Sequence, residues 1–228
     1  MLGLIGPNGA GKTTIFDLIS GFQRADGGRV VLEGVDVTSA SAHARARLGL
    51  GRSFQSARLW PSLTVREALA TGLEASVDVR AALPAMLNLP LVKDSEERVH
   101  DRVDELLSLL GIEAWGDRFV SELSTGVRRM VDLGVQLANE PSVLLLDEPS
   151  SGIASKETEA LGPTLKAVQA HLGCSLLIIE HDMPLVRSLA DRLVALDAGA
   201  VVAEGRPDDV LAHPRVVESY LGEGWVGT

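Results

Sequence analysis

The sequence lacks the features that mark secreted, membrane-spanning and metal-stapled proteins. Its single cysteine, Cys174, excludes an intrachain disulfide framework, and no Cys/His cluster has the spacing of a zinc site. The longest apolar runs, residues 143–146 and 175–179, fall far short of the roughly 20 residues that a membrane span needs. The first residues are apolar without a preceding basic region, unlike a signal peptide. These absences favour a protein of the reducing cytoplasm.

Positive charge is also scarce. The 228 residues hold 21 Lys and Arg against 31 Asp and Glu, a formal net charge of −10. This balance argues against sequence-independent attachment to nucleic acid or anionic lipid, so no nucleic-acid partner is expected. Hydrophobic residues make up 46% of the chain, enough to bury the core of one sizeable α/β domain or two small ones.

The chain begins with a strand, a loop and a helix. Residues 2–5 form a short apolar run that stops at Gly6, and residues 12–20 have helical character and end at Gly21. Residues 29–33 are rich in β-formers, and a further short strand is expected within residues 48–55.

Helical patterns dominate the middle of the chain. Thr64 and Glu67 form a capping-box pattern that predicts a helix start, and residues 94–111 place apolar side chains at helical spacing. Another helix is expected from Ser124 towards Pro141, because proline ends helices. We therefore expect a mostly helical insert over residues 56–141.

Continuous apolar runs return after the insert. Residues 143–146 and 176–179 are typical of parallel strands buried on both faces, and residues 193–196 and 200–204 predict a β-hairpin. The predicted fold is α/β, with a parallel sheet flanked by helices in a core of residues 1–55 and 142–228. The chain is expected to form one domain with the insert inside it.

The residues from Gly6 to Thr13 match the phosphate-loop pattern G-x-x-x-x-G-K-[ST], placed between a strand and a helix as that pattern requires. Glycines allow backbone N–H groups to converge on phosphate oxygens, and the helix N-terminus adds positive potential. Lys12 can reach the β- and γ-phosphates, and the Thr13 hydroxyl can ligate Mg²⁺. The pattern predicts nucleotide binding.

A second acidic site follows the strand at residues 143–146. Asp147 can face the Mg²⁺ of a bound nucleotide, and Glu148 can accept a proton from an attacking water. The phosphate loop alone does not separate kinases, GTPases and ATPases. Helix capping is the alternative role for these two acids.

Five motifs, in order, resemble those of the ATP-binding subunits of ABC (ATP-binding cassette) transporters. GPNGAGKT resembles the Walker A loop, RSFQ at residues 52–55 the Q-loop, and LSTGV at residues 123–127 the LSGGQ signature. VLLLDEP at residues 143–149 resembles Walker B with its glutamate, and IEHD at residues 179–182 the switch-histidine segment. The resemblance extends over essentially the whole chain and implies a P-loop NTPase core of ABC type.

The resemblance implies a role for each matching residue. Glu148 is the expected general base, His181 orients the attacking water, and Gln55 senses both the metal and the γ-phosphate. The expected Mg²⁺ ligands are Thr13, Gln55 and Asp147. The expected ATP-binding residues are those of the loop, with two from the signature that act on an opposing subunit: Gly6, Asn8, Gly9, Ala10, Gly11, Lys12, Thr13, Thr14, Ser124 and Gly126.

The chain departs from the family pattern in four ways. Thr125 and Val127 replace a glycine and the glutamine of the signature, and Ala154 stands where the D-loop has aspartate. We expect an active ATPase with weakened communication between paired sites. The family's antiparallel strands and adenine-stacking aromatic residue before the loop are missing, so we expect weak nucleotide affinity. A fragment, a late start and excision from a fusion are all open explanations.

Within the family, the chain is most similar to ATPase subunits of branched-chain amino acid importers. The stretches that carry this resemblance are the insert between Thr71 and Asp101, residues 179–186 and residues 207–222. It implies permease partners, a second ATPase subunit in a head-to-tail dimer, an external solute-binding protein and a place at the inner face of the membrane. Importers of urea or short amides share the pattern, and a hydrolysis-impaired module and a soluble phosphotransferase are rival interpretations.

A surface for the permease is expected near Gln55 and residues 57–69. Leu59, Trp60, Pro61 and Leu63 would offer apolar contact there, or would instead cover the helical insert. The alternative interpretation of the tail is that residues from Asp209 to Tyr220 are only a small terminal helix packed on the core.

Overall fold

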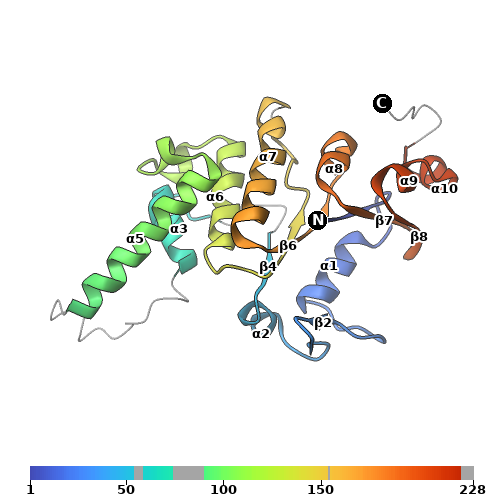
Figure 1. Ribbon diagram of the computed structural model, residues 1–228, viewed down its shortest axis with the longest axis horizontal. Coiled ribbons are helices and arrows are strands. Elements are labelled where there is room, and N and C mark those ends of the chain that lie inside the picture. Colours follow the sequence, from blue (N-terminus) through green and yellow to red (C-terminus); the bar gives the residue numbers. More distant parts are fainter. Residues whose placement is uncertain (54–58, 74–89, 154, 222–228) are drawn as a thin grey trace. The chain divides into compact units, whose positions relative to one another are not determined.

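The computed structural model describes residues 1–53, 59–73, 90–153 and 155–221 (Figure 1). The chain divides into two compact units. The first comprises Met1–Gln55, Pro141–Ser151 and Thr158–Thr228, and the second comprises Ser56–Glu140 and Gly152–Glu157. No helix in the described ranges is both long and apolar enough to cross a membrane.

A six-stranded sheet forms the centre of the first unit. Five neighbouring strands run parallel, and the sixth, β8, is antiparallel to β7. The parallel strands alternate along the chain with helices or longer segments, as crossover connections require. In spatial order the strands are β4 (Leu50–Arg52), β5 (Val143–Asp147), β6 (Ser175–Ile179), β1 (Leu2–Ile5), β7 (Arg192–Asp197) and β8 (Ala200–Gly205).

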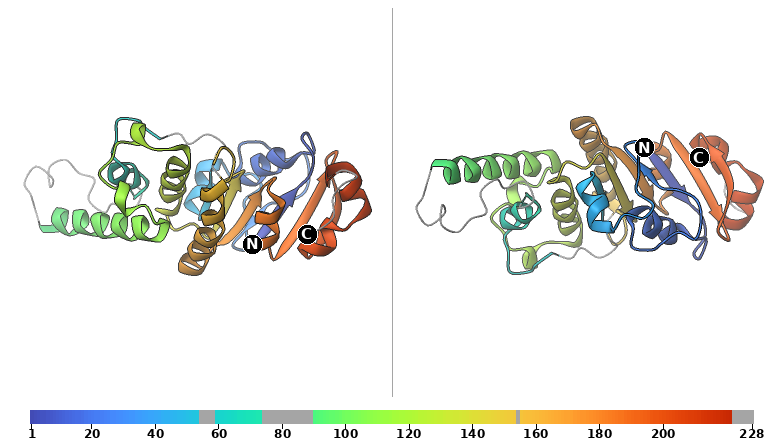
Figure 2. Two further views of the ribbon diagram at one scale, coloured as in Figure 1. Left: turned by 90° about the horizontal axis from the view of Figure 1, so that it is seen from above. Right: turned by 90° about the horizontal axis from the view of Figure 1, so that it is seen from below.

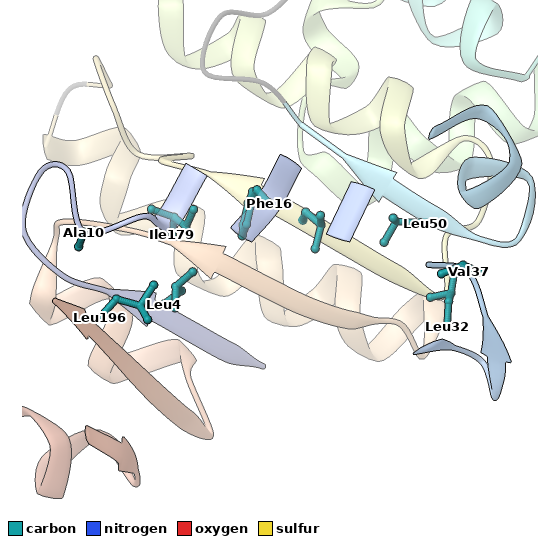
Figure 3. Close-up of a cluster of buried hydrophobic side chains, with 9 residues drawn as sticks. Leu4, Ala10, Phe16, Leu32, Val37, Leu50, Ile179 and Leu196 are labelled. Atoms are coloured by element: carbon teal, nitrogen blue, oxygen red, sulfur yellow. The ribbon is translucent and has the colours of Figure 1, made fainter. Parts of the chain in front are cut away.

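Helices cover both faces of this sheet. Successive residues of a strand point to opposite faces, so Leu4 and Ile5 of β1 belong to different clusters. Leu4 packs with Phe16 of α1 (Figure 3), and Ile5 packs with Met183 of α8 and Val210 of α9. Figure 2 accordingly shows α1 and α8 on opposite sides of the strands. The helices of this unit are α1 (Lys12–Ser20), α2 (Ala42–Arg47), α8 (Met183–Leu189), α9 (Pro207–Leu211), α10 (Pro214–Val216) and most of α7 (Ser155–Leu172).

A small separate hairpin joins α1 to α2. Strands β2 (Val31–Leu32) and β3 (Val35–Asp36) pair antiparallel. Glu33 and Gly34 both have positive φ, 49° and 77°, which is the backbone that a two-residue hairpin turn favours. Leu32 is buried with Leu50 in the cluster of Figure 3, so the hairpin continues the core of the first unit.

The second unit is helical and packs α3 (Val65–Leu73) and α5 (Pro90–Leu110) with α6 (Thr125–Leu137). Two glycines permit the close approach of α3 and α6. A Cβ on Gly72 would lie 2.6 Å from the Val135 carbonyl oxygen, and one on Gly134 would lie 2.4 Å from a methyl group of Leu69. Short 3-10 helices, Glu113–Trp115 and Val120–Glu122, lead from α5 to α6.

Most predicted elements are confirmed. The helix that starts at the capping box is α3, where the Thr64 amide donates to Glu67 Oε2 at 2.8 Å and the Glu67 amide to Thr64 Oγ1 at 3.2 Å. The hairpin at residues 193–204 is β7–β8. The single terminal helix is wrong: α9 ends at Leu211, His213 is extended, and α10 passes into a π-helix, Val217–Leu221. Pro214 explains the break, because the residue before proline avoids helical backbone.

Candidate nucleotide-binding and hydrolysis site

The predicted phosphate loop and acids lie at one edge of the sheet. Strands β5, β6 and β1 are neighbours and parallel, so their carboxyl ends meet there. Gly6 follows β1, Asp147 ends β5 with Glu148 directly after it, and His181 comes two residues after β6. Ligands of open α/β sheets bind at such an edge. The fold therefore brings together residues that are more than 170 positions apart in the sequence.

Gly6 turns the chain from β1 into the phosphate loop. Its φ is +151°, and a Cβ on this residue would lie only 2.2 Å from the Leu196 carbonyl oxygen at the end of β7. Gly9 and Gly11 also have positive φ, 85° and 101°, and Gly11 caps the N-terminus of α1. The loop is tied across the sheet edge by the Gly199 amide, which donates to the Ala10 carbonyl at 3.0 Å.

Lys12 bends its side chain over this loop. Its Nζ donates to the carbonyl oxygens of Gly6 at 2.7 Å and Pro7 at 3.0 Å, and only 7% of the residue is exposed. Burial lowers the pKa of the ammonium, while the nearby carboxylates of Glu148 and Asp147 act in the opposite direction. The ammonium is thus fixed at the loop and within the field of both acids.

Asp147 is buried at the end of β5, with 6% of the residue exposed. Its amide donates to Ser53 Oγ at 3.3 Å, and the Ser53 amide donates to the Leu145 carbonyl at 2.9 Å, so β4 holds the end of β5 in place. Burial raises the pKa of the Asp147 carboxyl, Glu148 raises it further, and Arg52 counteracts them. A cation bound near this carboxylate would stabilise its charged form and so offset the free-energy cost of burying it.

The side chain of Arg52, the last residue of β4, bonds to α1, the helix that follows the phosphate loop. Its Nη1 bonds to Asp17 Oδ1 at 2.7 Å and Ser20 Oγ at 2.6 Å. The guanidinium carbon also lies 5.3 Å from the centre of the Phe22 ring and 5.9 Å from that of Phe16. This arginine therefore anchors the helix whose N-terminus forms the loop.

Glu148 and His181 form a hydrogen-bonded pair. His181 Nε2 lies 3.0 Å from Glu148 Oε1. The Glu148 backbone is in the left-handed region, with φ 49°, and its amide donates to the Ile179 carbonyl at 2.9 Å. A non-glycine residue adopts this conformation at a cost of roughly 1–2 kcal/mol, which surrounding structure must offset. The strained backbone turns the Glu148 side chain towards the end of β6.

Glu180 holds the backbone around this pair. The side chain is buried, with 2% of the residue exposed. Oε1 accepts the Ser150 amide at 2.7 Å, and Oε2 accepts the amides of His181 at 3.0 Å and Asp182 at 3.4 Å. Three donors compensate the burial of one carboxylate. Glu180 thus ties the loop after β5 to the loop after β6.

Tyr220 reaches the pair from the C-terminal π-helix. Its hydroxyl lies 2.8 Å from His181 Nδ1, so both ring nitrogens of His181 have partners. Burial raises the pKa of the Tyr220 phenol to about 12, with further contributions from Glu180 and Glu148.

The described residues fit a nucleotide phosphate and its metal ion. Gly9 is exposed, and Asn8, Thr13 and Thr14 are exposed around it. Within the described ranges no three His, Cys, Asp or Glu side chains form a metal site of their own. Mg²⁺ in nucleotide sites needs no such cluster, because one or two protein oxygens and the phosphates suffice.

The remaining predicted residues lie in the second unit or outside the described ranges. Ser124 caps α6, where its Oγ accepts the Val127 amide at 3.3 Å, and Gly126 is buried in the first turn of that helix. Gln55 and Ala154 fall outside the described residues, so their predicted roles stay predictions.

Sequence reasoning missed three contributors to the site: Arg52 as an anchor of α1, Glu180 and Tyr220. An acid directly after the predicted buried strand was a usable signal for Glu180, since a carboxylate buried there needs partners. For Tyr220 the sequence offers only that it is the one tyrosine in the chain.

A parallel sheet with a glycine-rich loop after β1 and an acid after β5 defines a P-loop nucleotide-binding protein. A family model described as "ABC transporter" matches residues 1–151, and one described as "Branched-chain amino acid ATP-binding cassette transporter" matches residues 200–226. The chain therefore belongs to the ABC transporter family, among its ATP-binding proteins.

Two curated relatives and one solved structure illustrate the similarity. The chain is 32% identical over 223 residues to the high-affinity branched-chain amino acid transport ATP-binding proteins BraF of Pseudomonas aeruginosa and LivG of Escherichia coli, covering 98% of this chain and 87% of each relative. MJ1267, an ATP-binding cassette of an ABC transporter in its ADP conformation, superimposes with a TM-score of 0.81 at 32% identity, over 98% of this chain and 88% of the other.

Proposed function

We propose that this chain hydrolyses ATP and thereby drives the import of branched-chain amino acids through a membrane permease. The observation that carries the hydrolytic part is the Glu148–His181 pair, with 3.0 Å between Oε1 and Nε2, at the sheet edge that also bears Lys12 and Asp147. The transport part is supported by the names of the relatives and by the match of the C-terminal region to the branched-chain amino acid cassette model.

The loop residues bind the phosphates of ATP. Loop amides and the N-terminus of α1 supply donors and positive potential, and the Lys12 ammonium moves from the loop carbonyls to phosphate oxygens. Thr13 and Asp147 would hold Mg²⁺, with Gln55 as a further ligand, and the ion neutralises phosphate charge when bound.

Glu148 and His181 act on the water. Glu148 Oε accepts a proton from the water as its oxygen attacks the γ-phosphorus, and the bond to the ADP oxygen breaks. His181 donates a hydrogen bond from Nε2 to Glu148 Oε1, which orients this carboxylate towards the water. Glu180 fixes the backbone on which both groups are carried.

Partners complete the assembly in this proposal. A second ATPase subunit in head-to-tail arrangement supplies Ser124 and Gly126 at the N-terminus of α6, which suits contact with phosphate oxygens. Permease subunits place the chain at the inner face of the membrane, and an external solute-binding protein delivers the cargo.

Trp60 marks the proposed permease-binding surface. The residue is 61% exposed, whereas its neighbours Leu59 and Leu63 are half-buried. Its segment pairs with the one that bears Phe119, 48% exposed: the Val120 amide donates to the Leu63 carbonyl at 2.9 Å, and the Ser121 amide to the Pro61 carbonyl at 3.2 Å. Exposed aromatic residues on adjacent segments are typical of a protein-binding surface.

Uptake of labelled leucine tests the proposal. The chain is reconstituted in vesicles with its permease subunits and solute-binding protein, and ATP is supplied on the side of the ATPase. We expect uptake that is lost in Glu148→Gln and inhibited by valine and isoleucine. Inhibition by urea or acetamide without inhibition by valine would instead assign the importer to amides, and uptake unaffected by Glu148→Gln would contradict the coupling to hydrolysis.

A further inference from the structure

The C-terminal segment contacts the proposed hydrolytic pair through one hydroxyl group. Tyr220 Oη lies 2.8 Å from His181 Nδ1, although the two residues are 39 positions apart. Their ring centroids are 6.0 Å apart with an interplanar angle of 51°, so the rings are tilted and the contact is made by the polar atoms. No motif of the phosphate loop or of the acidic strand includes Tyr220.

The segment that carries Tyr220 is held by the core. Val216, 2% exposed, is buried in the cluster that contains Ile5 of β1 and Met183 of α8, and Tyr220 packs against the same cluster. Ile5 directly precedes the phosphate loop. Tyr220 is therefore held against the buried cluster to which the strand before the loop contributes Ile5.

The hydrogen-bond chemistry of the three side chains selects one tautomer of His181. An ionised Glu148 can only accept, so Nε2 must carry the proton in the contact with Glu148 Oε1. In a neutral imidazole Nδ1 is then the acceptor, and the Tyr220 hydroxyl must donate to it. The raised pKa of Tyr220, about 12, keeps the phenol protonated at neutral pH.

We propose that Tyr220 is a positioning residue for ATP hydrolysis, whose hydroxyl holds His181 in the Nε2–H tautomer and in the ring orientation that faces Glu148. The inference rests on the proposed function. It makes the C-terminal segment a part of the hydrolytic site through His181, without any contact of its own with the reacting atoms. Without the hydroxyl, the Nδ1–H tautomer becomes accessible and turns a lone pair of Nε2 towards the carboxylate of Glu148.

Tyr220→Phe is the sharpest test, because it removes the hydroxyl and keeps the ring. Ser219→Ala is the matched control: it removes a hydroxyl from the next residue of the π-helix, where Ser219 Oγ donates to the Arg215 carbonyl at 2.7 Å. The full chain is labelled with ¹⁵N-histidine, and the His181 signals among the five histidines are assigned by their loss in His181→Gln. Steady-state hydrolysis of ATP is measured on the same preparations.

We expect wild type and Ser219→Ala to show the Nε2–H tautomer at neutral pH, and Tyr220→Phe to show a mixture. In Tyr220→Phe we expect kcat to fall about threefold to tenfold, the range for one hydrogen bond, while KM for ATP stays within about twofold. A purely structural role would change KM or stability without changing the tautomer.

Two results would overturn the inference: an unchanged tautomer in Tyr220→Phe, or a changed tautomer with unchanged kcat. Failure of the proposed function gives a different pattern. Wild-type turnover no faster than that of Glu148→Gln would refute hydrolysis, and with it the positioning role, whereas the tautomer comparison would still report whether Tyr220 controls His181.

Discussion

The two compact units place polar groups very differently. In the described part of the chain, the buried polar or charged side chains of the first unit are Lys12, Ser20, Arg45, Ser53, Asp147 and Glu180, and the second unit has Asp132 alone. In the same part of the chain, the second unit exposes three aromatic residues, Trp60 at 61%, Phe119 at 48% and Trp115 at 38%, and the first unit exposes one, Phe22 at 61%.

This difference indicates a division of labour. Burying charge costs free energy unless partners are present. The first unit offsets this cost with hydrogen bonds, and its polar groups are thereby held in place at the sheet edge, ready to bind phosphate and move a proton. Exposed aromatic residues cost little in an isolated domain and supply area for binding another protein. The first unit therefore has the properties of a chemical site, and the second unit those of a contact surface.

The largest effect is expected at Gly6. In Gly6→Ala the new Cβ would lie 2.2 Å from the Leu196 carbonyl oxygen, in a backbone conformation with φ +151°. Overpacking and left-handed strain together predict a loss of about 3 kcal/mol or more, which lowers Tm by roughly 6–12 °C in a chain of this size. Differential scanning calorimetry measures the change.

Gly9→Ala is the matched control for Gly6→Ala. Gly9 also has positive φ, +85°, but nothing lies within 4 Å of its ideal Cβ. The expected loss is therefore limited to the backbone term of roughly 1–2 kcal/mol. Equal losses in the two variants would contradict the close approach of the loop to the end of β7.

Trp60→Ala should separate the two units functionally. We expect transport by the reconstituted assembly to fall about tenfold, as for an interface hot spot, while ATP hydrolysis by the isolated chain stays within about twofold. The control is Val201→Ala, because Val201 is 60% exposed in the first unit and should leave both activities unchanged. A parallel fall of transport and isolated hydrolysis would argue that Trp60 supports the fold of the second unit.

Glu180→Gln tests the backbone clamp in the first unit. An amide places a donor where the carboxylate accepts from the Ser150, His181 and Asp182 amides, so one N–H loses its partner. We expect a loss of about 1–3 kcal/mol in stability and a several-fold lower kcat. Glu204→Gln is the control, at an exposed residue that pairs with Arg192, and it should change neither stability nor kcat. Equal effects of the two substitutions would contradict the role of Glu180 in holding the backbone.

The smallest effect concerns Asp132, the one buried acid among the described residues of the second unit. Burial raises the pKa of Asp132 to about 6 from its usual 3.8, against the opposing field of Arg129. Because this pKa is raised in the folded state, the protonated Asp132 carboxyl contributes its full stabilisation of the folded protein below pH 4. That stabilisation is lost as pH rises through about 6.

Asp132→Asn should therefore raise Tm at pH 8 and leave it nearly unchanged at pH 4. The shift of about two pKa units sets a ceiling near 3 kcal/mol, and we expect about 1 kcal/mol because a buried asparagine also costs free energy. Thermal unfolding of both proteins between pH 4 and 8 measures the difference. A Tm difference independent of pH would show that the ionisation of Asp132 does not limit stability.

Local patterns were sufficient for the phosphate loop, for β1, β5 and β6, and for the β7–β8 hairpin. Each depends on neighbouring residues, namely glycines that permit positive φ or apolar runs of strand length. The capping box at Thr64 predicted the start of α3 in the same way. Helix α7 is not predicted by such patterns, because Pro163 lies inside it. Helix α8 is only seven residues long and begins at the Asp182 cap, whose Oδ1 accepts the Leu185 amide at 2.9 Å.

The second layer of the site could not be predicted for a different reason. The contact of Tyr220 with His181 and the three bonds of Glu180 depend on how loops from separate strands meet, which no local periodicity encodes. The π-helix that carries Tyr220 also follows a proline break that the predicted single helix did not include. Sequence motifs predicted the reacting groups, and the fold shows which residues lie against them.

Steady-state ATP hydrolysis by the purified full chain, compared with Glu148→Gln, tests the central claim most directly. Both proteins retain the phosphate loop, so both should bind ATP with similar affinity. The account predicts that Glu148→Gln lowers kcat about 10²-fold to 10⁴-fold, as for loss of a general base. A wild-type rate no higher than that of Glu148→Gln would contradict the assignment of hydrolysis to this sheet edge.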